Sequence, residues 1–167
     1  METHYTQPTL RTTQILGLLA SLGICFAAAG IGAWFTISEI PGWYTALKKP
    51  TWNPPNDVFG PVWNTLYLMM AVAAWWVWRS AGFSNGRVAL ATFGAQLVLN
   101  TLWSILFFGL HRPDWAFIEI VVLWIAIGAT IYAFAKISRL AAGLLVPYWL
   151  WVAFAAVLNY QIWRLNA

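Results

Sequence analysis

The stretch VALATFGAQLVLNTLWSILFFGL, residues 88–110, contains no charged residue and decides the fold class. A helix needs about 20 consecutive apolar residues to cross the roughly 30 Å hydrocarbon core of a bilayer, and this stretch is long enough. Its apolar residues follow one another without the alternation typical of a membrane-barrel strand. The stretch therefore predicts a membrane-spanning α-helix.

Four other stretches are similarly apolar. Residues 12–38, 58–78 and 140–163 contain no charged residue, and residues 115–135 contain only Glu119. Lipid offers no hydrogen bonds to an exposed backbone, so each stretch must bond its own peptide groups as a helix. Together with residues 88–110, they predict five crossings of a membrane.

These crossings predict an all-α integral membrane protein with a single domain over residues 1–167. Asn85-Gly86 is typical of a turn, and it predicts the reversal of the chain between the second and third crossings. The expected architecture is a bundle of five transmembrane helices, with a long ordered loop between the first two, at about residues 13–36, 60–79, 87–110, 114–136 and 139–164.

The composition excludes a water-soluble domain. Hydrophobic residues make up 61% of the chain and charged residues only 8%, whereas a soluble domain has roughly 25% charged residues. The net charge of +4 comes from basic residues around apolar segments, which predicts contact with the lipid bilayer and no binding of nucleic acid. With one cysteine and two histidines, we expect neither a disulfide framework nor a metal site.

The one long connection, residues 37–59, carries prolines at positions 41, 50, 54 and 55 and three aromatic residues before its end. Residues 43–47 predict a short helix inside it. Structureless loops of this length are uncommon in compact domains and are usually functional or disordered. We expect an ordered lid across one end of the bundle; the alternative is an anchor whose tryptophans sit at headgroup depth.

Polar and aromatic side chains share helix faces in the third and fifth spans. Amides in hydrocarbon must face the bundle interior, since a lipid-facing amide lacks a partner. A cavity with flat aromatic walls and a few amides suits a large, flat, mostly apolar ligand. The alternative for any one tryptophan is core packing or an interfacial belt. The two faces consist of Gln96, Asn100, Trp103 and Phe107, and of Pro147, Trp151, Ala155 and Asn159.

Several long motifs make the chain resemble the TspO/MBR family, the tryptophan-rich sensory proteins and mitochondrial translocator proteins. The motifs are WYTALKKPTWNPP (residues 43–55), GPVWNTLY (60–67), QLVLNTLWSILFFG (96–109) and VPYWLWVAFAAVLNYQIWRLN (146–166). The five-helix bundle of that family agrees with the spans counted above.

The resemblance implies a sensor-like membrane protein that binds tetrapyrroles, namely protoporphyrin IX or haem, and benzodiazepine-site ligands, with no cofactor required. Alternatives are light-dependent porphyrin degradation and transport of porphyrin or sterol. For the degradation it implies Trp63 and Trp151 as catalytic residues, while Trp149 would face elsewhere. The ligand-binding residues implied are Tyr44, Pro54, Trp63, Tyr67, Asn100, Trp103, Trp151 and Ala155.

Two further features carry weaker predictions. Leu158, Tyr160 and Arg164 fit the pattern proposed for cholesterol binding, although a helix end with an interfacial tyrosine gives the same pattern. Glu119 lies near the start of its span, so we expect its carboxylate to reach the membrane interface; the alternative is a proton or ion relay.

A stripe of small residues also runs along the first span, and Ala91 and Ala95 lie on the third. Small residues let helices approach closely in lipid, so we expect a homodimer through these faces, the alternative being packing within one protomer. The resemblance implies a bacterial cell membrane or, in a eukaryote, the mitochondrial outer membrane. The stripe on the first span comprises Gly17, Ser21, Cys25, Ala29 and Ala33.

Overall fold

The computed structural model describes residues 8–167, with side chains from Arg11 onward. The described residues form helices and no strand. Two of the elements, η1 and η2, are single π-helical turns. In chain order the elements are α1 (Pro8–Ile37), η1 (Ile40–Tyr44), α2 (Asn56–Ser104), η2 (Ile105–Gly109), α3 (Pro113–Ala135) and α4 (Arg139–Asn166).

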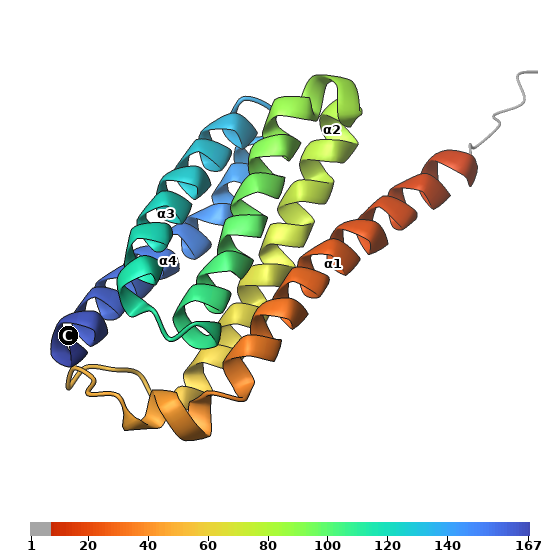
Figure 1. Cartoon of the computed structure of the whole chain (residues 1–167). Helices are drawn as coiled ribbons and strands as arrows, with labels where there is room; N and C mark the ends of the chain where they lie inside the picture. The colour runs from red at the N-terminus through yellow and green to blue at the C-terminus, as the bar shows by residue number, and fades with distance from the viewer. Residues whose placement is uncertain (1–7) are drawn as a thin grey trace, which may run out of the picture.

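Helix α2 crosses the bundle twice, and Figure 1 shows its two halves running side by side in opposite directions. The reversal lies at Gly82, whose φ of 66° is accessible mainly to a residue without a Cβ atom. We call residues 56–81 the first leg and residues 83–104 the second leg. Four of the described helices are long and apolar enough to cross a membrane. Because α2 supplies two crossings, the predicted five-span membrane bundle is confirmed.

The turn predicted at Asn85-Gly86 is wrong by a few residues, because both residues lie inside the second leg. Gly86 is buried, and a Cβ atom there would lie 3.6 Å from the Cβ atom of Ala81. The positive φ at position 82 favours glycine and makes the turn there, whereas a Cβ atom at position 86 would make only ordinary van der Waals contacts. The sequence does not show which of the two glycines makes the turn.

The stripe of small residues on α1 packs within the chain, against the first leg of α2. The Ser21 hydroxyl donates to the Ala71 carbonyl oxygen over 2.7 Å, and Cys25 is fully buried. A Cβ atom at Gly17 would lie 2.2 Å from the Trp78 ring, so this approach depends on glycine. Within one chain the stripe thus packs against α2, and a homodimer that also uses this helix stays a prediction.

A homodimer through the third span stays a prediction. Ala91 and Ala95 lie on the exposed side of the second leg. Nothing within 4 Å would meet a Cβ atom at the neighbouring Gly94 among the described residues. This side of the leg is therefore open to lipid or to another helix.

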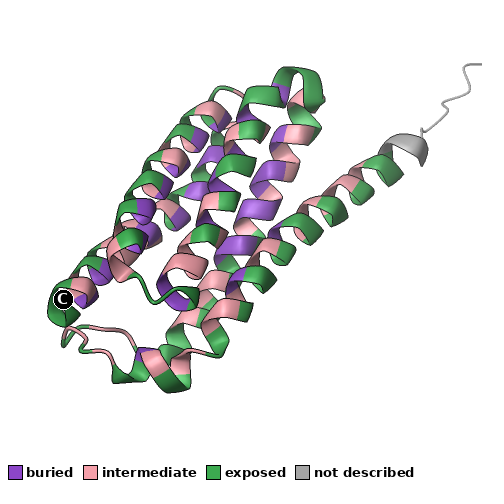
Figure 2. Ribbon diagram, in the orientation of Figure 1, coloured by how far each residue is buried: buried purple, intermediate pink, exposed green. Residues whose placement is uncertain are grey.

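The buried faces of α2, α3 and α4 point toward one another, as the purple bands in Figure 2 show. Local signals fix where these helices begin. Pro113 occupies the first turn of α3, where its missing N–H is no loss, and the Ser138 hydroxyl accepts from the Ala141 N–H at the start of α4. The segment between α1 and α2 lies at the end of the bundle where α4 finishes (Figure 1). The predicted lid is thus placed across one end.

Candidate functional site

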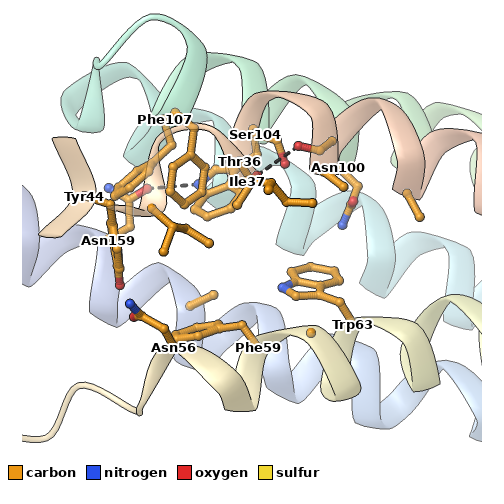
Figure 3. Close-up of a pocket in the computed structure, with 18 of the residues that line it drawn as sticks. Thr36, Ile37, Tyr44, Asn56, Phe59, Trp63, Asn100, Ser104, Phe107 and Asn159 are labelled. Atoms are coloured by element: carbon orange, nitrogen blue, oxygen red, sulfur yellow. Dashed lines mark hydrogen bonds between the residues drawn. The ribbon is translucent and has the colours of Figure 1, made fainter. Parts of the chain in front are cut away.

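A cavity of about 470 Å³ lies at the lid end of the bundle. Its walls come from α1, both legs of α2, η2 and α4, and the lid contributes Ile40 and Tyr44; α3 supplies none of its lining residues. Figure 3 shows Trp63 projecting from the first leg toward the space that Asn100 borders from the second leg. The volume falls in the range of pockets that bind small molecules.

The walls of the cavity are mainly aromatic and amide-bearing. Aromatic rings offer large flat apolar surfaces, and indole and phenol groups add a polar edge. A flat, largely apolar ligand with a few polar atoms therefore suits this lining. The aromatic residues that line the cavity are Tyr44, Phe59, Trp63, Tyr67, Trp103, Phe107, Phe108 and Trp151.

Two of the indoles in the wall differ in their hydrogen bonding. Trp103 Nε1 donates to Asn159 Oδ1 over 3.0 Å, and Asn159 Nδ2 donates in turn to the Pro113 carbonyl oxygen over 2.8 Å. Trp151 Nε1 is buried and has no partner within the described residues. Trp103 is thus held by the protein, whereas the buried Trp151 N–H group makes no hydrogen bond to the described residues.

A hydrogen bond of Tyr44 holds the lid internally, and two hydrogen bonds of Asn166 join the lid to the bundle. The Tyr44 hydroxyl donates to Asn53 Oδ1 over 3.2 Å within the lid, and its ring lines the cavity. Burial raises the pKa of the Tyr44 phenol, and the hydrogen bond to Asn53 opposes this. Asn166 on α4 accepts from the Lys48 N–H over 3.0 Å and donates to the Lys48 carbonyl oxygen over 2.9 Å. Its amide thus makes one accepted and one donated hydrogen bond with the lid backbone, the same pair that a neighbouring β-strand would make.

A second contact holds the other side of the lid to the connection between η2 and α3. His111, with a φ of 52°, places its Nε2 atom 2.8 Å from Glu39 Oε2. Its ring stacks on Trp43 with 4.3 Å between centroids. His111 therefore contributes to lid closure, and it is absent from the residues that line the cavity.

We expect Asn166→Ala to loosen the lid. The substitution removes both hydrogen bonds to the Lys48 backbone, and each is worth about 1 kcal/mol net. The amides of residues 45–52 should then exchange with solvent roughly tenfold faster or more, which hydrogen–deuterium exchange measures. Arg164→Ala, at an exposed position of the same helix, is the matched control. Unchanged exchange in Asn166→Ala would show that other contacts close the lid.

Comparison with known proteins identifies the family. The TspO/MBR family model matches residues 21–164. The chain belongs to the TspO/MBR family. It is 44% identical to the tryptophan-rich protein TspO of Chlorobaculum tepidum over 154 residues, which cover 92% of this chain and 98% of that protein. It is 43% identical to the translocator protein of Sus scrofa over 116 residues, which cover 68% of this chain and 69% of that protein. It is 40% identical to the tryptophan-rich sensory protein of Cereibacter sphaeroides over 114 residues, which cover 68% of this chain and 70% of that protein.

This TspO/MBR protein brings together most of the residues implied by the resemblance. Pro54 does not line the cavity; it lies in the lid, where its carbonyl oxygen accepts from Asn53 Nδ2 over 2.8 Å. Trp149 is also outside the lining and stacks on Trp124 with 4.7 Å between ring centroids. The implied residues that do line the cavity are Tyr44, Trp63, Tyr67, Asn100, Trp103, Trp151 and Ala155.

One wall of the cavity in this TspO/MBR protein consists of residues outside those predicted from the sequence. Ala29 and Ala33 belong to the small-residue stripe on α1, and Thr36 follows one turn later. The stripe could have predicted this wall, because small residues leave room for a cavity as well as for a neighbouring helix. Phe59 lies four residues before Trp63 on the first leg, and this helical spacing indicated a shared face.

The structure does not place the three residues of the predicted sterol pattern on one face. Leu158 is buried and lines the cavity, whereas Tyr160 is 40% exposed and packs against Phe117 and Trp163 on the outside of the bundle. Arg164 is exposed near the end of α4. Residues two apart on a helix point in different directions. Sterol binding by this TspO/MBR protein therefore stays a prediction.

The expectation that Glu119 reaches the membrane interface is corrected. Its side chain is buried in the bundle, and the whole residue is only 7% exposed. Neither carboxyl oxygen has a hydrogen-bond partner within the described residues. Position along the span suggested access to water, but α3 turns this face toward α2 and α4.

Proposed function

We propose that this protein is a sensor-like membrane protein that binds a tetrapyrrole, such as protoporphyrin IX or haem, in the aromatic cavity beneath the lid. The cavity is also suited to flat, neutral ligands of the benzodiazepine-site class. The observation that carries the proposal is the set of flat aromatic walls around about 470 Å³.

The polar groups around the cavity support a large ligand with few polar atoms. Asn56 and Asn64 supply amides on the first leg of α2. A macrocycle can stack on the aromatic rings while its acidic substituents stay near the lid, where water is closer. The names of the relatives, translocator protein and tryptophan-rich sensory protein, accord with a ligand-responsive membrane protein. Such a protein would reside in a bacterial cell membrane or a mitochondrial outer membrane.

Tryptophan fluorescence tests the proposed binding directly. Protoporphyrin IX is titrated into the purified protein in darkness, and quenching should saturate with one equivalent per chain. A neutral benzodiazepine-site ligand should compete for the same site. Quenching that fails to saturate, or that a large excess of competitor leaves unchanged, would contradict binding in this cavity.

A second candidate function is light-dependent oxidation of the bound porphyrin. Trp63 and Trp151 both line the cavity, whereas Trp149 does not, and this placement favours the two indoles implied by the resemblance. In this reaction dioxygen is the oxidant and the porphyrin is oxidised. The light-excited porphyrin takes an electron from an indole and passes it to dioxygen, and the indole radical cation then recovers an electron from the porphyrin, which is left oxidised. Illumination of the bound complex should then bleach the porphyrin absorbance only when dioxygen is present.

We expect substitutions of the two lid lysines to have different effects on ligand binding. Lys48 is exposed, while Lys49 Nζ donates to the carbonyl oxygens of Thr45 and Leu47 and lies 4.6 Å from the centroid of the Tyr44 ring. We therefore expect Lys48→Gln to weaken binding of anionic protoporphyrin IX about threefold and to spare a neutral ligand, since an exposed charge contributes less than about 1 kcal/mol.

Lys49→Gln should weaken both ligands to a similar extent, because it removes contacts that shape the lid. Burial of this ammonium group lowers its pKa, which agrees with a packed position. Parallel titrations of the two variants with both ligands measure the difference. A charge-selective loss in Lys49→Gln would assign the steering role to that lysine instead.

A further inference from the structure

The cavity opens on one side of the bundle. Among its lining residues, the exposed ones lie on two helices: Ile37 on α1, and Asn56, Gly60 and Asn64 on the first leg of α2. The lining residues from the lid, the second leg, η2 and α4 are all buried or half-buried. The three on the first leg recur every four residues and therefore share one face. The opening thus lies between α1 and the first leg, and Figure 3 shows Ile37 and Asn56 on opposite sides of the cavity.

Helix α1 leaves room for this opening because it crosses from one leg of α2 to the other. Farther from the lid, α1 packs on the first leg, where the Ser21 hydroxyl donates to the Ala71 carbonyl oxygen. Near the lid it packs on the second leg and η2, so closely that a Cβ atom at Gly32 would lie 3.1 Å from Ser104 Oγ. Figure 1 shows α1 running obliquely to the two legs. At the lid end the cavity therefore lies between α1 and the first leg.

The opening extends to the depth of the hydrocarbon core. The first leg, residues 56–81, is about 39 Å long at about 1.5 Å per residue, and the core is about 30 Å thick. A leg centred on the core therefore extends beyond it by only about 4–5 Å at each end. Asn64 lies about 12 Å along the helix from Asn56, which is well inside the core. An amide against lipid is unfavourable, which accords with a border to the cavity at this position.

The lid closes the route into the cavity from the water beyond it. Ile40 and Tyr44, which the lid contributes to the lining, are not exposed. One side of the lid is tied to α4 by the two hydrogen bonds of Asn166, and the other side is tied to His111 through Glu39. Entry through the lid requires these contacts to open, whereas entry between α1 and the first leg breaks none of them.

We propose that ligands enter this cavity sideways from the bilayer, between α1 and the first leg of α2, while the lid stays closed. The ligands are flat, neutral, lipid-soluble aromatic molecules, which concentrate in the hydrocarbon before they reach the opening. Gly60 is a gating position, because it borders the opening without a side chain, and a Cβ atom there would meet no described atom within 4 Å. The inference rests on the cavity of the proposed function and adds the route into it.

Stopped-flow quenching of tryptophan fluorescence tests the route. The full chain is placed in phosphatidylcholine nanodiscs, and 9-nitroanthracene, a flat neutral quencher, is added. Quenching of lipid-facing tryptophans grows in proportion to the probe, whereas quenching from the cavity saturates and gives the association rate. Dilution into empty phosphatidylcholine vesicles then gives the dissociation rate. Gly60→Leu should slow both rates about tenfold, because a narrower passage raises the barrier in both directions. The dissociation constant, which is the ratio of the two rates, should change far less than either rate.

Two further variants separate the opening from the lid and from the substitution itself. Gly143→Leu adds the same side chain at an exposed glycine of α4, outside the cavity lining and also clear of described atoms within 4 Å, and it should keep the parent rates. Asn166→Ala, which frees one side of the lid, should keep the parent association rate. Faster association in Asn166→Ala, or parent rates in Gly60→Leu, would overturn the proposal. Faster dissociation in Gly60→Leu would also overturn it, since Gly60 would then be a contact of the bound ligand.

Asn64→Phe keeps the test decisive if a leucine directly before Pro61 disturbs the helix. It narrows the opening one turn deeper, from an exposed position, and it should likewise slow both rates. Parent rates in this variant, or the absence of a saturating phase in the parent protein, would contradict sideways entry. Protoporphyrin IX is titrated into the same proteins as a separate measurement. If 9-nitroanthracene follows the expected pattern but protoporphyrin IX does not bind, the proposed function fails while the sideways route stands.

Discussion

Replacing Ala155 with phenylalanine is expected to lower the affinity for protoporphyrin IX by about 100-fold. Ala155 lines the cavity from α4, one turn from Trp151 and one turn from Asn159. A phenyl ring at this position occupies the space between the aromatic walls. Forcing a ligand into an overfilled site costs about 1–3 kcal/mol or more, and each 1.4 kcal/mol is a factor of ten in affinity. Quenching of tryptophan fluorescence measures the change.

Val157→Phe is the matched control for this substitution. It adds the same side chain to the same helix, but Val157 is 54% exposed and faces away from the cavity. Its affinity should stay within a factor of two of the parent. The thermal unfolding of both variants in detergent reports whether the fold is kept. Parent-like binding by Ala155→Phe would place the porphyrin outside this cavity.

The second large effect is expected on light-dependent loss of porphyrin. Trp63→Phe and Trp151→Phe keep a flat apolar ring but lack the readily oxidised indole. Other aromatic residues share the stacking surface, so each variant should bind protoporphyrin IX with a moderate loss, within about tenfold. The rate at which illumination bleaches the bound porphyrin should fall by about tenfold or more. Absorbance followed under constant illumination, with the site saturated, measures this rate.

Trp149→Phe is the control, because it removes an indole that does not line the cavity. Trp149 lies two residues from Trp151, but it stacks on Trp124 and its Nε1 atom donates to the Trp124 carbonyl oxygen over 3.1 Å. This variant should bleach porphyrin at the parent rate. Parent rates in Trp63→Phe and Trp151→Phe as well would leave the tryptophans as binding groups only. Any photochemistry would then belong to the porphyrin itself.

Much of the cavity lining could be predicted from helical spacing. Trp63 and Tyr67 lie four residues apart on one leg of α2, and Trp151 and Ala155 lie four apart on α4. Such pairs share a helix face whatever the helix packs against. Pro54 lies in the lid, where no helical periodicity fixes the direction of a side chain. It is the one predicted ligand-binding residue that does not line the cavity.

The class of the protein and the positions of its spans follow from local properties of the amino-acid sequence. The length of an apolar stretch decides whether it can cross a bilayer, and the absence of water forces it to be helical. Both requirements act on a local segment, so no partner helix has to be known. The long motifs likewise indicated the family before any geometry was considered.

Only the tertiary structure decided which face of each helix meets protein and which meets lipid. Lipid tails are as apolar as leucine side chains, so an apolar residue does not reveal which of the two it contacts. From the sequence, the α1 stripe could face a second copy or the same chain, and the structure shows its contact with α2. From the sequence, the Glu119 side chain could face the membrane interface or the interior of the bundle. The orientation of α3 buries it inside the bundle. Distant segments must come together to settle such choices, because a helix pattern gives the faces but does not give their neighbours.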